Sequence, residues 1–263
     1  MAVADSRAVP TVIADHVDIV YKVIAGQGGK GTAANALRRI VNRQDRPTIR
    51  EVHAVKDVSF TAYKGDAIGV IGRNGSGKST LLRAIAGLLP PASGVVYTGG
   101  RPSLLGVNAA MMNDLTGDRN VVLGCLAMGM SPADIQRRYD EIVEFSGIGD
   151  FIDLPMSTYS SGMAARLKFA IASAKTHDIL LVDEALATGD TEFRIRSEQR
   201  IKELREEAGT VFLVSHSLDV VLDTCNRAIW LDGGVLRQDG PVDDVVDAYL
   251  KSTRAKAATK TKS

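Results

Sequence analysis

The segment that most limits the fold is "GRNGSGKS", residues 72–79, because of what stands on either side of it. The residues before it, "AIGVI", are apolar on both faces of a strand, which is typical of a buried parallel strand. The residues after it, "KSTLLRAIAGLL", have the pattern of a helix that ends before Pro90. A glycine-rich loop in this setting lets consecutive backbone N–H groups point at phosphate oxygens. The segment therefore predicts a strand–loop–helix unit that binds a nucleotide phosphate.

Two short segments supply the side chains that a nucleoside triphosphate needs. Lys78 offers a positive charge to the β and γ phosphates, and Ser79 offers a hydroxyl to Mg²⁺. In "ILLVDE" the apolar run ends at Asp183, a carboxylate suited to Mg²⁺, and Glu184 can orient or deprotonate an attacking water. The sequence therefore predicts a phosphate-hydrolysing site that holds Mg²⁺, and the resemblance described below implies ATP as the nucleotide. The simpler alternatives are a glycine-rich turn with a solvated lysine and an acidic helix cap.

Composition excludes several classes of protein. The 263 residues are 45% hydrophobic with a formal net charge of +1, which allows a packed core and argues against a dedicated nucleic-acid binder. The two cysteines, Cys125 and Cys225, have no paired spacing and predict buried thiols in a reducing cytosol. No apolar run reaches the ~20 residues that cross a bilayer. A role at a membrane would therefore depend on a partner.

The order of patterns predicts a parallel α/β core with a helical insert and some antiparallel strands. Residues 12–21 alternate as a half-buried strand does, residues 101–175 read as mostly helical, and "RAIWLDGGVLRQDG" reads as a hairpin. The basic stretch in residues 25–51 interrupts the strands. We expect a basic, disordered tail at residues 251–263 because its apolar content is low.

Five motifs in order resemble the ATP-binding subunit of an ATP-binding-cassette (ABC) transporter over about residues 10–250. They are "GRNGSGKST" for the Walker A loop, "YSSGM" for the signature, "ILLVDE" for Walker B, "ALATGD" for the D-loop and "VSHSLD" for the switch histidine. The resemblance implies a P-loop NTPase of the ABC nucleotide-binding type, with an antiparallel β subdomain and a helical subdomain. Its implied divisions are an N-terminal extension at 1–10, the nucleotide-binding domain at 11–250, a helical subdomain at about 101–175, a family insertion at about 25–51 and the tail at 251–263.

The resemblance also implies roles for individual residues. His216 would hydrogen-bond the γ-phosphate and hold Glu184 in place, and Tyr21 would stack on adenine, although a tyrosine at a strand end can equally be core. The implied catalytic residues are Glu184 and His216, and the implied Mg²⁺ ligands are Ser79 and Asp183. The implied ATP contacts are Tyr21, Gly72, Asn74, Gly75, Ser76, Gly77, Lys78, Ser79, Thr80, Ser160, Ser161, Gly162 and Asp190.

Two departures from the family pattern narrow the resemblance. The family's glutamine between Walker A and the signature is missing, and Asn108 stands near its position. In the signature, Ser161 and Met163 replace a glycine and a glutamine, while Ser160 and Gly162 match. These features resemble polysaccharide and teichoic-acid exporters of the Wzt and TagH types. The chain resembles the shorter form without a C-terminal carbohydrate-binding domain, as in actinobacterial galactan exporters.

This resemblance implies a set of partners. They are a second copy of the chain in a head-to-tail dimer around two ATP molecules, an integral membrane permease, and a lipid-linked polysaccharide as cargo, with no nucleic acid. The protein would lie at the cytoplasmic face of the membrane, held by the permease. "LLGVNAAMM" (104–112) would dock on the permease or pack inside the insert, and the basic stretch 30–50 would meet anionic lipid or water. A non-transport cassette ATPase and a nucleotide-binding regulator are the alternative functions.

Overall fold

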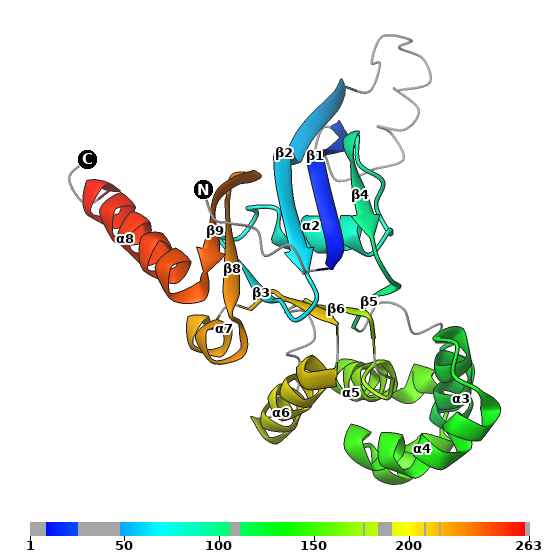
Figure 1. The fold of residues 1–263 in the computed structure, drawn as a ribbon. Helices are drawn as coiled ribbons and strands as arrows, with labels where there is room; N and C mark the ends of the chain where they lie inside the picture. The colour runs from blue at the N-terminus through cyan, green and yellow to red at the C-terminus, as the bar shows by residue number, and fades with distance from the viewer. Residues whose placement is uncertain are drawn as a thin grey trace, which may run out of the picture.

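The structure is a computed structural model that describes residues 9–25, 48–105, 111–175, 177–183, 191–207, 209–215 and 217–260. Two sheets, one three-stranded and one six-stranded, and a group of helices make up the described parts of the chain. Figure 1 shows the three-stranded sheet above the six-stranded one, with helices below it and at its side.

The three-stranded sheet is antiparallel, with the strand order β2-β1-β4. Val12, Ala14, Val17 and Ile19 are buried, which agrees with the predicted alternation along the first strand. The pairing register shifts between Ala14 and Ile19, where bulges locally break the strict alternation. The strands are β1 (Pro10–Ala25), β2 (Thr48–Tyr63) and β4 (Ser93–Thr98).

The six-stranded sheet has the order β5-β6-β7-β3-β8-β9 and is parallel except for the hairpin of its last two strands. All residues of β3, β6 and β7 are buried, so these strands need apolar side chains on both faces. Its strands are β3 (Ala67–Ile71), β5 (Pro102–Leu104), β6 (Ile179–Val182), β7 (Thr210–Leu213), β8 (Arg227–Asp232) and β9 (Val235–Pro241).

Helices pack on both faces of the six-stranded sheet. The helix α2 (Lys78–Ile85) lies between the two sheets, where Leu81, Leu82 and Ile85 join strands of both in one core. A second core on the opposite face gathers residues of the remaining core helices. These helices are α5 (Ser161–Ala172), α6 (Thr191–Glu207), α7 (Leu218–Thr224) and α8 (Val242–Lys260).

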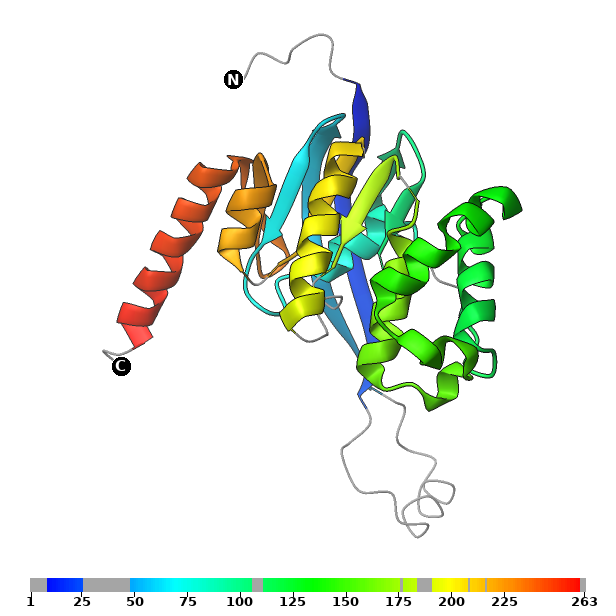
Figure 2. The same cartoon turned by 90° about the horizontal axis from the view of Figure 1, so that it is seen from below.

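A helical subdomain with its own core lies at one end of the molecule, opposite α8 (Figure 2). Its helices begin at side-chain caps: Thr116 accepts from Arg119 N, and Ser131 accepts from Asp134 N, with Pro132 in the first turn. Besides α5, its helices are α3 (Gly117–Ala127), α4 (Pro132–Ser146), and the 3₁₀ turns η1 (Gly149–Asp153) and η2 (Met156–Thr158).

A buried asparagine fixes the backbone that leads into this subdomain. Asn120 is fully buried, and its Oδ1 accepts from Met112 N at 2.8 Å. Its Nδ2 donates to the carbonyls of Met112, Leu115 and Thr116 at 3.0, 3.1 and 2.9 Å. The Met112 side chain is 54% exposed, so its backbone is held while its thioether faces outward.

Three predicted boundaries are corrected. The helix α8 continues through Lys260, where the sequence predicted disorder from residue 251, because alanine, lysine and arginine are good helix formers on a helix already packed against the sheet. The predicted insertion at 25–51 is narrower, since β1 runs to Ala25 and β2 starts at Thr48; residues 26–47 lie outside the described residues. The predicted helical stretch 101–175 also opens with β5, which belongs to the six-stranded sheet.

None of the helices in the described parts of the chain is both long and apolar enough to cross a membrane.

Candidate functional site

The glycine-rich loop leaves the central strand β3 and enters α2, as the sequence predicts. Gly72 has φ 148°, and a Cβ there would lie 2.2 Å from Leu231 O and 2.6 Å from Ser76 Oγ. Gly77 has φ 102°, and a Cβ there would lie 2.3 Å from Ala54 O. Side chains are therefore excluded at both ends of the loop, which lets the backbone curl tightly at the start of α2.

Lys78 is buried at the start of the helix and reaches back over the loop. Its Nζ donates to Gly72 O at 2.8 Å and to Arg73 O at 3.2 Å. Burial lowers the pKa of Lys78, and the negative charge of Asp183 opposes that shift. The ammonium group thus stands inside the loop, where an incoming phosphate could take over its hydrogen bonds.

Ser79 and Asp183 meet across the sheet edge. The Ser79 hydroxyl donates to Asp183 Oδ1 at 3.0 Å, and Asp183 directly follows β6. A hydroxyl and a carboxylate oxygen are ligands that Mg²⁺ prefers, so this pair fits the predicted cation. In the described ranges no three His, Cys, Asp or Glu side chains gather to hold a metal, so water and phosphate oxygens would complete the shell.

A pocket of about 550 Å³ opens beside the loop. Ser76 is 3% exposed and its Oγ has no hydrogen-bond partner in the described structure, which leaves a buried polar atom for a ligand to satisfy. Thr80 follows in the first turn of α2. The pocket is lined by Arg73, Asn74, Gly75, Ser76, Asp232 and Gly233.

Asp232 and Gly233 were not predicted as site residues. They form the turn of the β8–β9 hairpin, and β8 pairs with β3 in parallel, so both strands end at the same edge. Gly234 N also donates to Ser76 O at 3.1 Å, which ties the hairpin to the loop. The sequence predicted the hairpin that contains Asp232 and Gly233. It could not place that hairpin beside the loop, because this depends on the pairing of β8 with β3.

Tyr21 lies beside the loop. Its hydroxyl is 3.4 Å from Thr80 Oγ1, which places the ring on β1 next to the first turn of α2. The side chain is half-buried. Contact with adenine stays a prediction for Tyr21.

The signature segment forms a separate helix start. Ser160 caps α5, and its Oγ accepts from Met163 N at 3.2 Å. The nearest neighbour of a Cβ at Gly162 would be Ser160 Oγ at 3.9 Å, so the space beside it is open. Within the described residues no hydrogen bond joins Ser160, Ser161 or Gly162 to the loop at 72–80. The two predicted phosphate-binding segments lead into two different helices, α2 and α5.

Four predicted residues lie outside the described residues: Glu184, Asp190, His216 and Asn108. The described parts nearest to them in sequence are Asp183, the start of α6 and the end of β7. Their predicted roles stay predictions.

The sequence of this chain is similar to those of known proteins. A family model described as "ABC transporter" matches residues 55–187. The chain is 40% identical over 204 residues to the O-antigen export system ATP-binding protein RfbB of Klebsiella pneumoniae, covering 77% of this chain and 83% of that protein. It is 42% identical over 199 residues to the teichoic acids export ATP-binding protein TagH of Staphylococcus saprophyticus, covering 76% of this chain and 75% of that protein.

Solved structures share the fold. One is the dimeric post-hydrolysis state of an ATP-binding cassette bound to ADP and Pi, with a TM-score of 0.67 and 22% identity over 88% of this chain and 98% of that one. Another is an ATP-binding subunit of an ABC transporter, with a TM-score of 0.68 and 20% identity over 91% of this chain and 93% of that one. At these identities the likeness concerns the fold.

Proposed function

Because this chain belongs to the ABC transporter family and is by that membership an ATPase subunit, we propose that it powers export of a lipid-linked polysaccharide through a separate membrane permease. The observation that carries the ATPase half of the proposal is the meeting of Ser79 with Asp183 at 3.0 Å, beside the buried Lys78, and the export half is supported by the names of the relatives. These three side chains come from a loop and a strand end that are 104 residues apart in sequence. Their convergence supports a nucleotide-hydrolysing site and argues against a glycine-rich turn.

In this site each residue has a distinct task. Ser79 and Asp183 would hold Mg²⁺, which when bound neutralises charge on the phosphate oxygens. Lys78 binds the β and γ phosphates through its ammonium group. Glu184 orients the attacking water and accepts its proton, and His216 holds Glu184 and the γ-phosphate.

The separate helix start of α5 supports a dimer. Backbone N–H groups and the Ser160 hydroxyl at a helix N-terminus suit a phosphate, and the space beside Gly162 is open. This segment leads into a helix other than that of the loop at 72–80, and by the family resemblance it would complete the site of a second copy. Two copies placed head to tail would then enclose two ATP molecules.

The cargo follows from the relatives. The relatives above are named for O-antigen export and for teichoic acid export. We assign this chain to the same class of cargo, with a neutral galactan-like polymer as one member. The permease would hold the ATPase at the cytoplasmic face of the membrane.

A purified-protein assay tests the ATPase half of the proposal. Lys78→Ala should weaken binding of a fluorescent ATP analogue by about 10- to 100-fold, because charge-assisted hydrogen bonds of roughly 1.5–3 kcal/mol are lost. Lys64→Ala removes the same charge from an exposed turn and is the matched control. Equal affinity of the two variants would reject the phosphate-loop assignment.

A cellular assay tests the export half. Pull-down from detergent extract should return an integral membrane subunit, and depletion should accumulate lipid-linked polymer on the cytoplasmic side. Phosphorus analysis of that polymer separates a polyol-phosphate teichoic acid from a neutral or O-antigen-like glycan. Recovery of ribosomes or DNA alone would favour a non-transport cassette ATPase, and ATP binding without hydrolysis would favour a regulator.

A further inference from the structure

Three helices meet at a junction behind the candidate site. Phe145 of α4, Phe169 of α5 and Phe193 of α6 form a triangle with ring centroids 5.7 to 5.9 Å apart. The signature segment leads into α5, and the D-loop segment leads into α6. The junction therefore packs α6 against α5, the helix whose first residues would face the nucleotide of a second copy.

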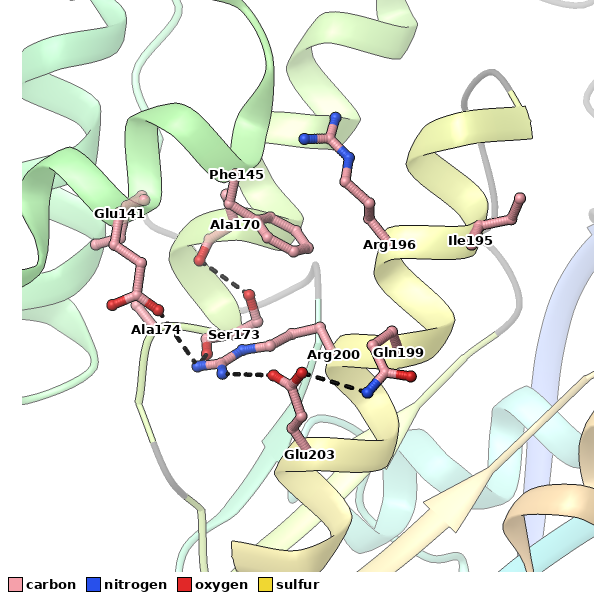
Figure 3. Close-up of a pocket in the computed structure, with 11 residues that line it drawn as sticks. Glu141, Phe145, Ala170, Ser173, Ala174, Ile195, Arg196, Gln199, Arg200 and Glu203 are labelled. Carbon is pink, nitrogen blue, oxygen red and sulfur yellow. Dashed lines mark hydrogen bonds and ion pairs between the residues drawn. The ribbon is translucent and has the colours of Figure 1, made fainter.

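Packing at this junction is incomplete. A pocket of about 380 Å³ lies between α4, α5 and α6, with Ala170 and Ala174 on one side and Ile195 at its rim (Figure 3). Small side chains beside this open space give α5 fewer dispersion contacts on the side that faces α6, because a gap has no partner atoms. On its other sides α5 is packed through the buried Leu167 and Ile171, so polar contacts at its C-terminal end act in addition to this packing.

Arg200 of α6 crosses this space to the end of α5. Its Nη2 donates to Ser173 O at 2.9 Å, and its Nη1 pairs with Glu203 Oε2 at 3.0 Å (Figure 3). Glu141 of α4 lies 4.0 Å from Nη2. The Arg200 side chain is 16% exposed, whereas Glu203 and Glu141 are 45% and 60% exposed, so solvent screens the two ion pairs and the hydrogen bond to Ser173 O is the main contact.

Ser173 is the C-terminal cap of α5, so its carbonyl belongs to the negative end of that helix. A guanidinium group there stabilises the helix end in two ways: it donates a hydrogen bond to a terminal carbonyl, and its positive charge lies near the negative end of the helix dipole. Arg138 of α4 donates to the next carbonyl, that of Ala174. The end of α5 is thus fastened to both neighbouring helices by arginines.

Because α5 is long, the arginine contacts at its C-terminal end influence the position of the signature segment at its N-terminal end. From Phe169 to Ser161 the helix extends about 12 Å, so a tilt of about 5° around Phe169 moves its first turn by about 1 Å. The same tilt moves the Ser173 end by about 0.5 Å, enough to strain a short hydrogen bond. A misplacement of about 1 Å at a reacting centre can cost on the order of 10²-fold in rate.

We propose that Arg200 is a positioning residue that sets the angle of α5, and thereby the fit of Ser160 and Gly162 to the nucleotide bound by a second copy. This rests on the proposed function, because it assumes an ATP-dependent dimer. It assigns Arg200 no contact with the nucleotide bound by its own chain. Loss of Arg200 should therefore leave that binding step intact.

The test uses the full chain and compares Arg200→Ala with Arg137→Ala, an exposed arginine of α4 that pairs with Asp134 in its own helix. In a Glu184→Gln background, ATP-driven dimerisation is followed by sedimentation and normalised to the protein that binds ATP. For Arg200→Ala in this background we expect unchanged affinity of the monomer for a fluorescent ATP analogue and a dimer weakened about tenfold or more. In the chain that keeps Glu184, Arg200→Ala should reduce kcat about 10- to 100-fold at constant KM. Arg137→Ala should behave as the parent does.

Arg200→Lys separates positioning from folding. A lysine keeps the charge and can make one of the two contacts, so it should recover part of the dimerisation. A loss of fold alone lowers the ATP-binding fraction without changing the dissociation constant of the remaining dimer. If Arg200→Ala does not fold, the test rests on Arg200→Lys. In that case, dimerisation of Arg200→Lys as tight as that of the parent would overturn the inference.

The outcomes separate this inference from the function on which it rests. If the parent chain neither hydrolyses ATP nor forms an ATP-dependent dimer, the proposed function fails. If the parent does both and Arg200→Ala does so equally well, only the role of Arg200 fails. A weakened monomer affinity in Arg200→Ala would also overturn it.

Discussion

Replacing Gly77 by alanine tests how firmly the loop is held against β2. In the native backbone Gly77 has φ 102°, and its new Cβ would lie 2.3 Å from Ala54 O. A left-handed conformation costs alanine about 1–2 kcal/mol. Reaching a tolerable 3.0 Å also requires the loop or β2 to move by about 0.7 Å, and such overpacking costs about 1–3 kcal/mol. We expect the free energy of unfolding to fall by about 2–5 kcal/mol.

Gly87→Ala is the matched control at the other end of the same helix. Gly87 has φ 71°, and no atom lies within 4 Å of the position its Cβ would take. It should lose only the conformational part, about 1–2 kcal/mol. The difference between the two variants isolates the contact with Ala54.

The assay is urea unfolding followed by tryptophan fluorescence, since the chain has one tryptophan, Trp230. Trp230 lies opposite Ile71, the last residue of β3, so it reports on the strand that carries the loop. Titration with a fluorescent ATP analogue should show a further loss of affinity for Gly77→Ala only, because its loop is displaced. Equal unfolding free energies for Gly77→Ala and Gly87→Ala would refute the reasoning.

Three other perturbations address the site and the helical subdomain. Glu184→Gln should bind ATP, lose nearly all turnover and accumulate as an ATP-bound dimer in gel filtration; normal hydrolysis would remove Glu184 from the role of base. Gly162→Asp should abolish hydrolysis by placing a negative charge near phosphate, while the monomer still binds ATP; loss of monomer binding as well would contradict the two-segment site. Burial raises the pKa of the Cys125 thiol to about 11, so at pH 8 disulfide-forming reagents should label it only on unfolding, as peptide mapping would show; rapid native labelling would mean that α3 opens.

Predicted membership in the ABC transporter family and the predicted fold class are confirmed. The loop was predictable because its signal is local: glycines, a lysine and a serine within eight residues, between an apolar strand and a helix. The meeting of Ser79 with Asp183 was predictable because both follow buried strands whose carboxyl ends share an edge.

Other features depend on neighbours that the sequence does not reveal. Asp232 joins the pocket because β8 lies beside β3, and a hairpin pattern carries no information about its neighbouring strand. The length of α8 was not predicted because its last residues are low in apolar side chains, a composition typical of disorder. In the structure these residues extend a helix that has already formed over the preceding turns, so they need no nucleation of their own. Trp230 and Tyr249 pack with centroids 5.8 Å apart at that part of α8.

The hydrogen bonds of Asn120 have a kinetic consequence for the segment that ends at Met112. A flexible binding segment must be ordered when its partner arrives, and that ordering slows productive encounters or weakens the complex. Here the backbone of Met112 is already ordered by a fully buried amide, while its side chain stays free to change rotamer. If a partner binds at Met112, the exposed residue is presented from a backbone position that needs no ordering step.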